Sequence, residues 1–159
     1  MSPAKRIMQL RDEKHAAGHP FMINSDLLPS HMCVYEYADG SMRIAKLENG
    51  ELIICEEPND ELKASVLENL ELAKKLATPD CFNCAYRGSV PGSAHISCKN
   101  LSARVEGDEW GIKNGWFLWP FNFDPAWLKD CSGYIPNELV EKLKLKEVND
   151  DKNRNDGVV

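Results

Sequence analysis

The spacing of apolar residues predicts two helices in the first half of the chain. One begins at Pro3, carries Ile7 and Leu10 on its apolar face, and ends near Gly18. A second helix is predicted after Asp60, which is expected to cap it. Its apolar residues recur at steps of three and four positions, as an amphipathic helix requires: Leu62, Val66, Leu70, Ala73 and Ala77.

Two turn dipeptides between these helices predict a small antiparallel sheet. Asp39-Gly40 and Asn49-Gly50 favour the tight turns that join the strands of β-hairpins. They separate three β-prone runs: residues 33–37, 41–47 and 51–57. Residues 1–80 are therefore expected to form an α+β scaffold of helix, three-stranded meander and helix.

Residues 81–134 have neither a helical nor a strand period, apart from a short helix predicted from Asp124-Pro125 to Lys129. They contain all four tryptophans, ten of the thirteen aromatic residues and four of the six cysteines. This composition predicts a loop-rich, aromatic-rich module. Its aromatic run, residues 115–127, is interpreted first as the core of the module, with an exposed binding platform as the alternative.

The last part of the chain completes an α+β fold. An amphipathic helix is predicted over residues 135–148, with Pro136 and Asn137 at its start. Residues 149–159 are polar enough to predict a disordered tail. The expected order is helix, meander, helix, metal-stabilised four-cysteine module and C-terminal helix.

Composition and charge narrow the possible partners. The 159 residues are 43% hydrophobic and 28% charged, as in a folded globular protein. A formal net charge of −6 disfavours binding to duplex DNA. Residues 81–134 have five basic and five acidic side chains, a balance that suits a protein partner or a few stacked bases of single-stranded nucleic acid.

The start of the chain and its hydropathy predict a cytoplasmic protein without a membrane partner. No apolar run reaches the roughly 18 residues of a membrane span. The first residues lack the apolar core of a signal peptide, so a reducing compartment is expected. Disulfides are rare in such compartments, which directs attention to metal binding.

Four cysteines have a spacing typical of a structural metal site. Cys81 and Cys84 lie two residues apart, and Cys98 and Cys131 follow at longer intervals. Two thiolates on one tight turn and two from distant segments can complete a closed tetrahedral zinc site. A four-iron, four-sulfur cluster is the alternative, because it uses the same ligands. His95 is predicted to orient a metal-bound sulfur or to replace one ligand.

Two other uses of cysteine are less favoured for this set. Burial as small apolar side chains is the ordinary role of a free thiol, and it is the interpretation chosen for Cys33 and Cys55, which fall on predicted strands. A catalytic pair of Cys98 and His95 would also need an orienting third group and an oxyanion hole, and the sequence indicates neither. The sequence thus favours a small, non-enzymatic zinc-binding protein.

Two strings within residues 81–134 resemble segments of small uncharacterised cysteine-motif proteins of bacteria and their phages. They read Cys81-x2-Cys84-x-Tyr86-Arg87-Gly88-x-Val90-Pro91-Gly92-Ser93-x-His95-x2-Cys98 and Gly115-Trp116-Phe117-x-Trp119-Pro120-x-x-Phe123-Asp124-Pro125-x-Trp127-x3-Cys131. The resemblance implies that the four cysteines act as one set. It also implies that His95 and the Trp-Pro and Phe-Asp-Pro elements belong to the same module. It carries no activity.

Overall fold

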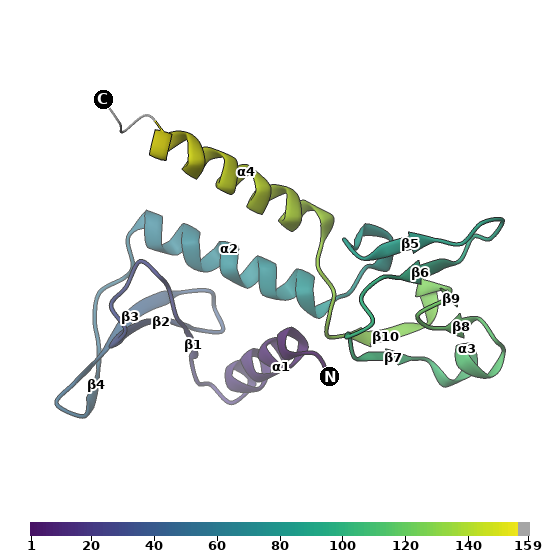
Figure 1. Ribbon diagram of the computed structural model, residues 1–159. Coiled ribbons are helices and arrows are strands. Elements are labelled where there is room, and N and C mark those ends of the chain that lie inside the picture. The colour runs from purple at the N-terminus through teal and green to yellow at the C-terminus, as the bar shows by residue number, and fades with distance from the viewer. Residues whose placement is uncertain (156–159) are drawn as a thin grey trace. The chain divides into compact units, whose positions relative to one another are not determined.

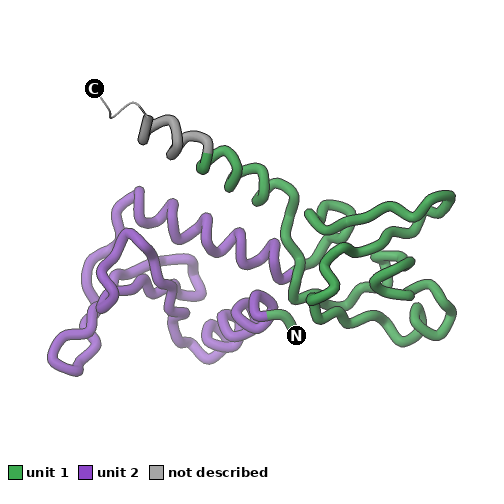
Figure 2. The backbone as a smooth tube through the Cα atoms, viewed as in Figure 1, with its two compact units in different colours: residues 1–2, 78–159 green, residues 3–77 purple. Residues whose placement is uncertain are grey.

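The computed structural model describes the backbone of residues 1–155 and the side chains of residues 1–147. The chain divides into two compact units, shown in Figure 2: unit 1 comprises residues 1–2 and 78–159, and unit 2 comprises residues 3–77. Each unit combines helices with antiparallel strands. The predicted α+β class is confirmed.

Unit 2 is a four-stranded antiparallel sheet with two helices. Its elements, labelled in Figure 1, are α1 (Pro3–Ala16), β1 (Phe21–Ile23), β2 (Met32–Glu36), β3 (Met42–Glu48), β4 (Glu51–Ile54) and α2 (Asp60–Ala77). The strands lie in the order β1-β2-β3-β4. The sequence analysis did not predict β1, because three residues are too few to show an alternating pattern.

The turn between β3 and β4 has the backbone that its sequence predicts. Asn49 and Gly50 both have positive φ angles, 53° and 79°, as a two-residue hairpin turn requires. The closing pair of this hairpin is Glu48 opposite Glu51. Asparagine is one of the few residues besides glycine that adopts this left-handed conformation readily.

The core of unit 2 lies between one face of the sheet and α2. Its buried side chains are Ile23, Val34, Met42 and Ile44 from the strands, and Leu62, Val66 and Leu70 from the helix. The three leucine and valine positions of α2 are those that the sequence period predicts. The cap is different from the prediction: the Asn59 side chain accepts the Leu62 N–H at 2.9 Å, and Asp60 is the first helical residue.

Helix α1 is fixed to the sheet by polar contacts. Arg11 donates from Nε to Glu36 Oε2 at 2.7 Å and from Nη2 to Glu36 Oε1 at 2.5 Å. His15 Nε2 lies 3.1 Å from the Glu36 carbonyl oxygen. The helix has no buried residue, and Ile7, predicted on its apolar face, is 44% exposed. Leu10, the other residue predicted on that face, is half-buried, and α1 also packs along α2.

We predict that Glu36→Gln lowers the free energy of unfolding by about 2–4 kcal/mol, because it leaves the Arg11 guanidinium without its counter-charge. Denaturation in urea, followed by circular dichroism, measures this loss. Glu13→Gln removes an exposed carboxylate of α1 and is the matched control. Equal unfolding midpoints for the two variants would contradict the assigned role of the Arg11–Glu36 pair.

Unit 1 contains more regular structure than the sequence indicates. Its elements, seen on the right of Figure 1 except for α4, are the 3-10 helix η1 (Cys81–Asn83), β5 (Arg87–Ser89), β6 (Ile96–Cys98), β7 (Val105–Gly107), α3 (Glu109–Lys113), β8 (Phe117–Leu118), β9 (Asn122–Phe123), the 3-10 helix η2 (Pro125–Trp127), β10 (Leu128–Cys131) and α4 (Asn137–Asn155). One sheet has the order β5-β6-β9-β8, and β10 pairs with β7 in another. Strands of two to four residues are too short to produce a detectable period.

Two predicted helices end at other residues than the sequence indicates. The helix predicted from Asp124-Pro125 to Lys129 is the single turn η2, which ends at Trp127 before the chain enters β10. Helix α4 continues to Asn155, so residues 149–155, predicted as a disordered tail, extend the helix. Residues 156–159 of that tail lie outside the described residues. Within the described part of the chain, no helix is both long and apolar enough to span a membrane.

The apolar core of unit 1 is small. It consists of Ile96, Phe117 and Phe123, with the two phenylalanine ring centroids 5.2 Å apart. A Cβ atom on Gly107 would lie 2.4 Å from Phe117 Cδ1, so β7 must have glycine at this position. The N–H of Ser2 donates to the buried carboxylate of Asp130, which places the first two residues in this unit.

Candidate metal centre

The first two candidate ligands lie on one tight turn. Cys81 begins η1 and Cys84 follows it directly. The Asp80 carboxylate accepts the Phe82 N–H at 3.0 Å, and the Cys84 N–H approaches the Cys81 carbonyl at 3.4 Å. Side chains three positions apart on such a turn lie on the same side of it. The local sequence thus places both thiols toward one point.

The other two candidate ligands lie at the ends of β6 and β10, and the chain next to each strand end is hydrogen-bonded to the segment that contains or follows the turn. Cys98 ends β6, and its strand pairs with β5, where Arg87 is its partner. Cys131 ends β10, and the chain after it returns to the turn, where Cys84 forms an antiparallel bridge with Pro136. The Ala85 N–H also donates to a carbonyl of this returning segment, at 2.9 Å. Backbone bonding therefore brings three segments together that are distant in sequence.

The thiols of this set are near enough to influence one another. Burial, followed by the charges of Cys131, Cys84 and Cys98, raises the pKa of Cys81 to about 12. Burial is also the main reason that the pKa of Cys131 is raised, and Cys84 and Cys98 again contribute. All four side chains are half-buried. The four predicted ligands share one partly desolvated neighbourhood.

The four thiols do not have the geometry of a formed metal site. Among the described residues, no three His, Cys, Asp or Glu side chains form a group that could hold a metal ion. The Cys98 thiol is directed to the Asn100 carbonyl oxygen, at 3.9 Å. Four thiols are a donor set that zinc prefers in kind, and binding a metal would require the sulfurs to move closer together.

His95 belongs to the same sheet as Cys98. Its Nδ1 lies 2.7 Å from Asn122 Oδ1, and the ring is half-buried. With the amide oxygen as acceptor, Nδ1 donates the hydrogen bond. This contact fixes the ring orientation. The predicted role of His95 as an orienting group or replacement ligand stays a prediction.

Cys33 and Cys55 lie in unit 2. Cys33 is 7% exposed in β2, and burial raises its pKa. Cys55 packs against the core of unit 2 and donates weakly to the Ile53 carbonyl oxygen at 3.7 Å. These positions agree with the interpretation of both residues as packed thiols, and they supply matched controls for the four candidate ligands.

The aromatic run of residues 115–127 serves two purposes. Phe117 and Phe123 are core residues, and the Trp116 and Trp127 rings stack with centroids 5.4 Å apart. Five large apolar residues of α3, β8 and the adjoining turns are exposed and are called here the exposed apolar group: Trp110 (58%), Ile112 (50%), Trp116 (42%), Leu118 (54%) and Phe121 (79%). The run of residues 115–127 therefore contains core residues and also exposed aromatic side chains, and a binding platform stays a prediction.

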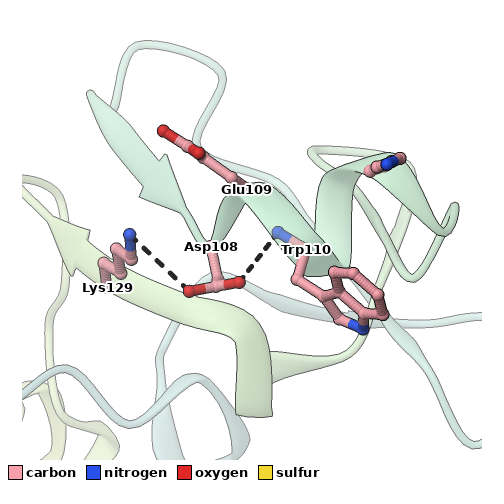
Figure 3. A pocket seen from close by; sticks show the side chains of 5 residues that line it. Asp108, Glu109, Trp110 and Lys129 are labelled. Carbon is pink, nitrogen blue, oxygen red and sulfur yellow. Dashed lines mark hydrogen bonds and ion pairs between the residues drawn. The ribbon is translucent and has the colours of Figure 1, made fainter.

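Trp110 also borders an open pocket that the sequence analysis did not single out. The pocket has a volume of about 500 Å³ and is lined by Asp108, Glu109, Trp110, Lys113 and Lys129. Figure 3 shows Asp108 between the Trp110 N–H, which it accepts at 2.9 Å, and Lys129 Nζ at 3.6 Å. Two acids and two lysines leave the pocket without net charge. The Asp108-Glu109 pair, a helix cap followed by a first-turn acid, was the available sequence signal for α3.

Comparison with models of protein families, with curated proteins and with solved structures finds no match to this chain. The resemblance of residues 81–134 to cysteine-motif proteins thus stays a prediction. The residues and their geometry have to support any functional conclusion.

We predict that Phe123→Ala lowers the free energy of unfolding by about 3–5 kcal/mol, because it removes a 1% exposed ring from a small core. Phe121→Ala, two positions away on a 79% exposed side chain, is expected to change it by less than about 0.5 kcal/mol. Thermal and urea denaturation of the two variants measure the contrast. A strongly destabilised Phe121→Ala protein would show that this ring has a structural role.

Proposed function

We propose that residues 81–134 form a zinc-binding module with Cys81, Cys84, Cys98 and Cys131 as ligands, and that the protein acts by binding a partner protein without catalysing a reaction. The observation that carries this proposal is the meeting of three cysteine-bearing segments through backbone hydrogen bonds. Thiolate sulfur is a preferred ligand of structural zinc.

The small core of unit 1 supports a structural role for the metal. Only Ile96, Phe117 and Phe123 form the buried cluster among the described residues, and the strands around it are two to four residues long. A metal that joins the turn at residues 81–84 to β6 and β10 adds folding free energy where apolar burial supplies little. Zinc binding displaces the thiol protons, and the charge of the ion offsets both the burial and the mutual repulsion of thiolates that raise the pKa of Cys81.

The exposed apolar group favours a protein as the partner. Aromatic and aliphatic residues are mixed in it, and both are suited to the apolar centre of a protein interface. The nearby cations are engaged: Lys129 pairs with Asp108, and Lys113 lies 5.9 Å from the Trp110 ring centroid. A nucleic-acid surface would need unpaired cations along the backbone path.

We predict that Cys81→Ser and Cys131→Ser abolish metal retention, because each removes a ligand from a four-coordinate site. Cys33→Ser and Cys55→Ser are expected to retain the metal content of the natural protein. Elemental analysis of anaerobically purified protein, expressed as zinc per chain, measures both effects. Equal metal content in all four variants would overturn the ligand assignment.

The visible spectrum of the same preparation separates the two metal hypotheses. A colourless protein with one zinc per chain agrees with the proposal. A brown protein containing iron and sulfide would replace zinc with a four-iron cluster on the same cysteines. Protein that lacks every metal after anaerobic purification and fails to take up added Zn²⁺ would overturn both.

The class of partner is tested with single-stranded oligonucleotides. We expect no binding at low salt by fluorescence anisotropy, and therefore no difference between the natural protein and Phe121→Ala. Affinity that falls as salt is added and is weakened by Phe121→Ala would contradict the assignment to a protein partner. It would indicate base stacking on the exposed apolar group.

A further inference from the structure

Strand β4 is an unprotected edge of the sheet in unit 2. It pairs with β3 on one side, and the strand order ends with it. Figures 1 and 2 show the β3–β4 hairpin extending beyond the rest of its unit. Proteins usually protect such an edge with lysine, proline or a covering segment, because an open edge pairs with other strands. The segment Glu51–Ile54 contains neither lysine nor proline.

The side chains of β4 are apolar and exposed on both faces. Leu52 is 51% exposed, Ile53 is 38% exposed and Ile54 is 47% exposed. Leu47, the partner of Leu52 on β3, is 55% exposed. Three consecutive large apolar residues on a free edge are a site for strand association.

The hydrogen-bonding phase of the hairpin decides which backbone groups face the open side. Glu48 and Glu51 close a two-residue turn and are a hydrogen-bonded pair, so Ile53 also bonds to β3. The Cys55 N–H donates to the Ile44 carbonyl at 2.7 Å in this phase, and the Ile44 N–H donates to the Glu56 carbonyl at 2.9 Å, so the regular strand ends with a bulge after Ile54. Leu52 and Ile54 alternate with these residues. Their N–H and C=O groups therefore point away from β3.

This phase makes β4 complementary to itself. We propose that two copies of this chain pair through β4, antiparallel, around a two-fold axis at Ile53. Leu52 then lies opposite Ile54 of the second copy, and each such pair exchanges two N–H···O bonds. Ile53 lies opposite its own equivalent across the axis, and apolar side chains pair on both faces.

The acidic residues around β4 select this register. With the axis at Ile53, Glu51 lies opposite Cys55 of the second copy, and no two carboxylates are directly opposite. A shift of the axis to Ile54 would bring Leu52 against Glu56 in the irregular segment after the strand and lose its apolar partner. A shift to Leu52 would pair Ile54 with Gly50 and lose apolar contact. The sequence of the hairpin thus favours one pairing.

The contact involves one short strand from each copy, so the interface buries a small area for a protein–protein association. Interfaces that bury less than about 1,200 Å² are typically weak and transient. We therefore expect a monomer–dimer equilibrium that depends on protein concentration in the micromolar range or above. The dimer uses unit 2 alone and requires neither the metal nor the exposed apolar group of unit 1.

Sedimentation equilibrium of the full chain over a series of concentrations tests the association. The dimer fraction is expected to rise with concentration for the natural protein. Ile53→Lys places two ammonium groups at the axis and is expected to remain monomeric. Leu118→Lys makes the same chemical change at an exposed position of unit 1 and is expected to dimerise normally.

Disulfide cross-linking tests the register and does not depend on the folding of the lysine variant. In an antiparallel sheet, the Cα atoms of a directly opposed, non-hydrogen-bonded pair are about 4.5 Å apart, within the range of a disulfide. Ile53→Cys is therefore expected to give a dimer linked through residue 53 on mild oxidation, identified by peptide mass spectrometry. Lys46→Cys is the control, since Lys46 neighbours Ile53 on β3 and its equivalents in the two copies would lie three strand spacings, about 14 Å, apart.

Two results would overturn the proposal. The first is a natural protein that stays monomeric at every concentration reached and an Ile53→Cys variant that gives no cross-link at residue 53. The second is a dimer that persists in Ile53→Lys, which would assign association to another surface. Loss of dimer in Leu118→Lys alone would instead place self-association on the exposed apolar group.

Discussion

The backbone bridge between the cysteine turn and the segment after β10 is the contact on which the organisation of unit 1 depends. It joins Cys84 to Pro136, and thus joins the first and last parts of the module. The short strands around it share three buried core side chains, against which partly buried residues such as Trp119, Trp127 and Leu128 pack. The bridge includes Cys84. The contact that joins the two ends of the module therefore lies at the candidate metal centre. A ligand that joins these thiols would strengthen the contact that the fold already makes.

Unit 2 relies on a different balance. Its sheet and α2 share a conventional apolar core, whereas α1 contributes no buried residue and is joined to the sheet by the Arg11–Glu36 pair. The hydrogen bond to Glu36 raises the pKa of Arg11. A buried ion pair of this kind specifies where a helix docks, although an apolar contact of the same size can be equally stabilising.

The sequence was most informative where periodicity or turn chemistry acts locally. It located α2 and its buried positions Leu62, Val66 and Leu70, and the left-handed turn at residues 49–50. It missed β1 and α3 because three and five residues define no period. On α1, the predicted apolar residue Leu10 is half-buried and Ile7 is exposed, and the ion pair to Glu36 cannot be recognised without the sheet. For the candidate site, spacing grouped the four cysteines, but the backbone bridge that draws them together requires the tertiary fold.

The two free edges of the sheet in unit 2 show why β4 differs from an ordinary surface strand. At the opposite edge, β1 has three residues and follows Pro20, so it offers little backbone for pairing. Strand β4 presents Leu52 and Ile54 with their backbone groups outward in the phase set by the turn at residues 49–50. The two-residue turn therefore determines the pairing of β3 with β4 and also which backbone groups of β4 point away from β3. An open edge can pair with many strands. The glutamates that flank the apolar centre of β4 restrict which strand can pair with it and in which register.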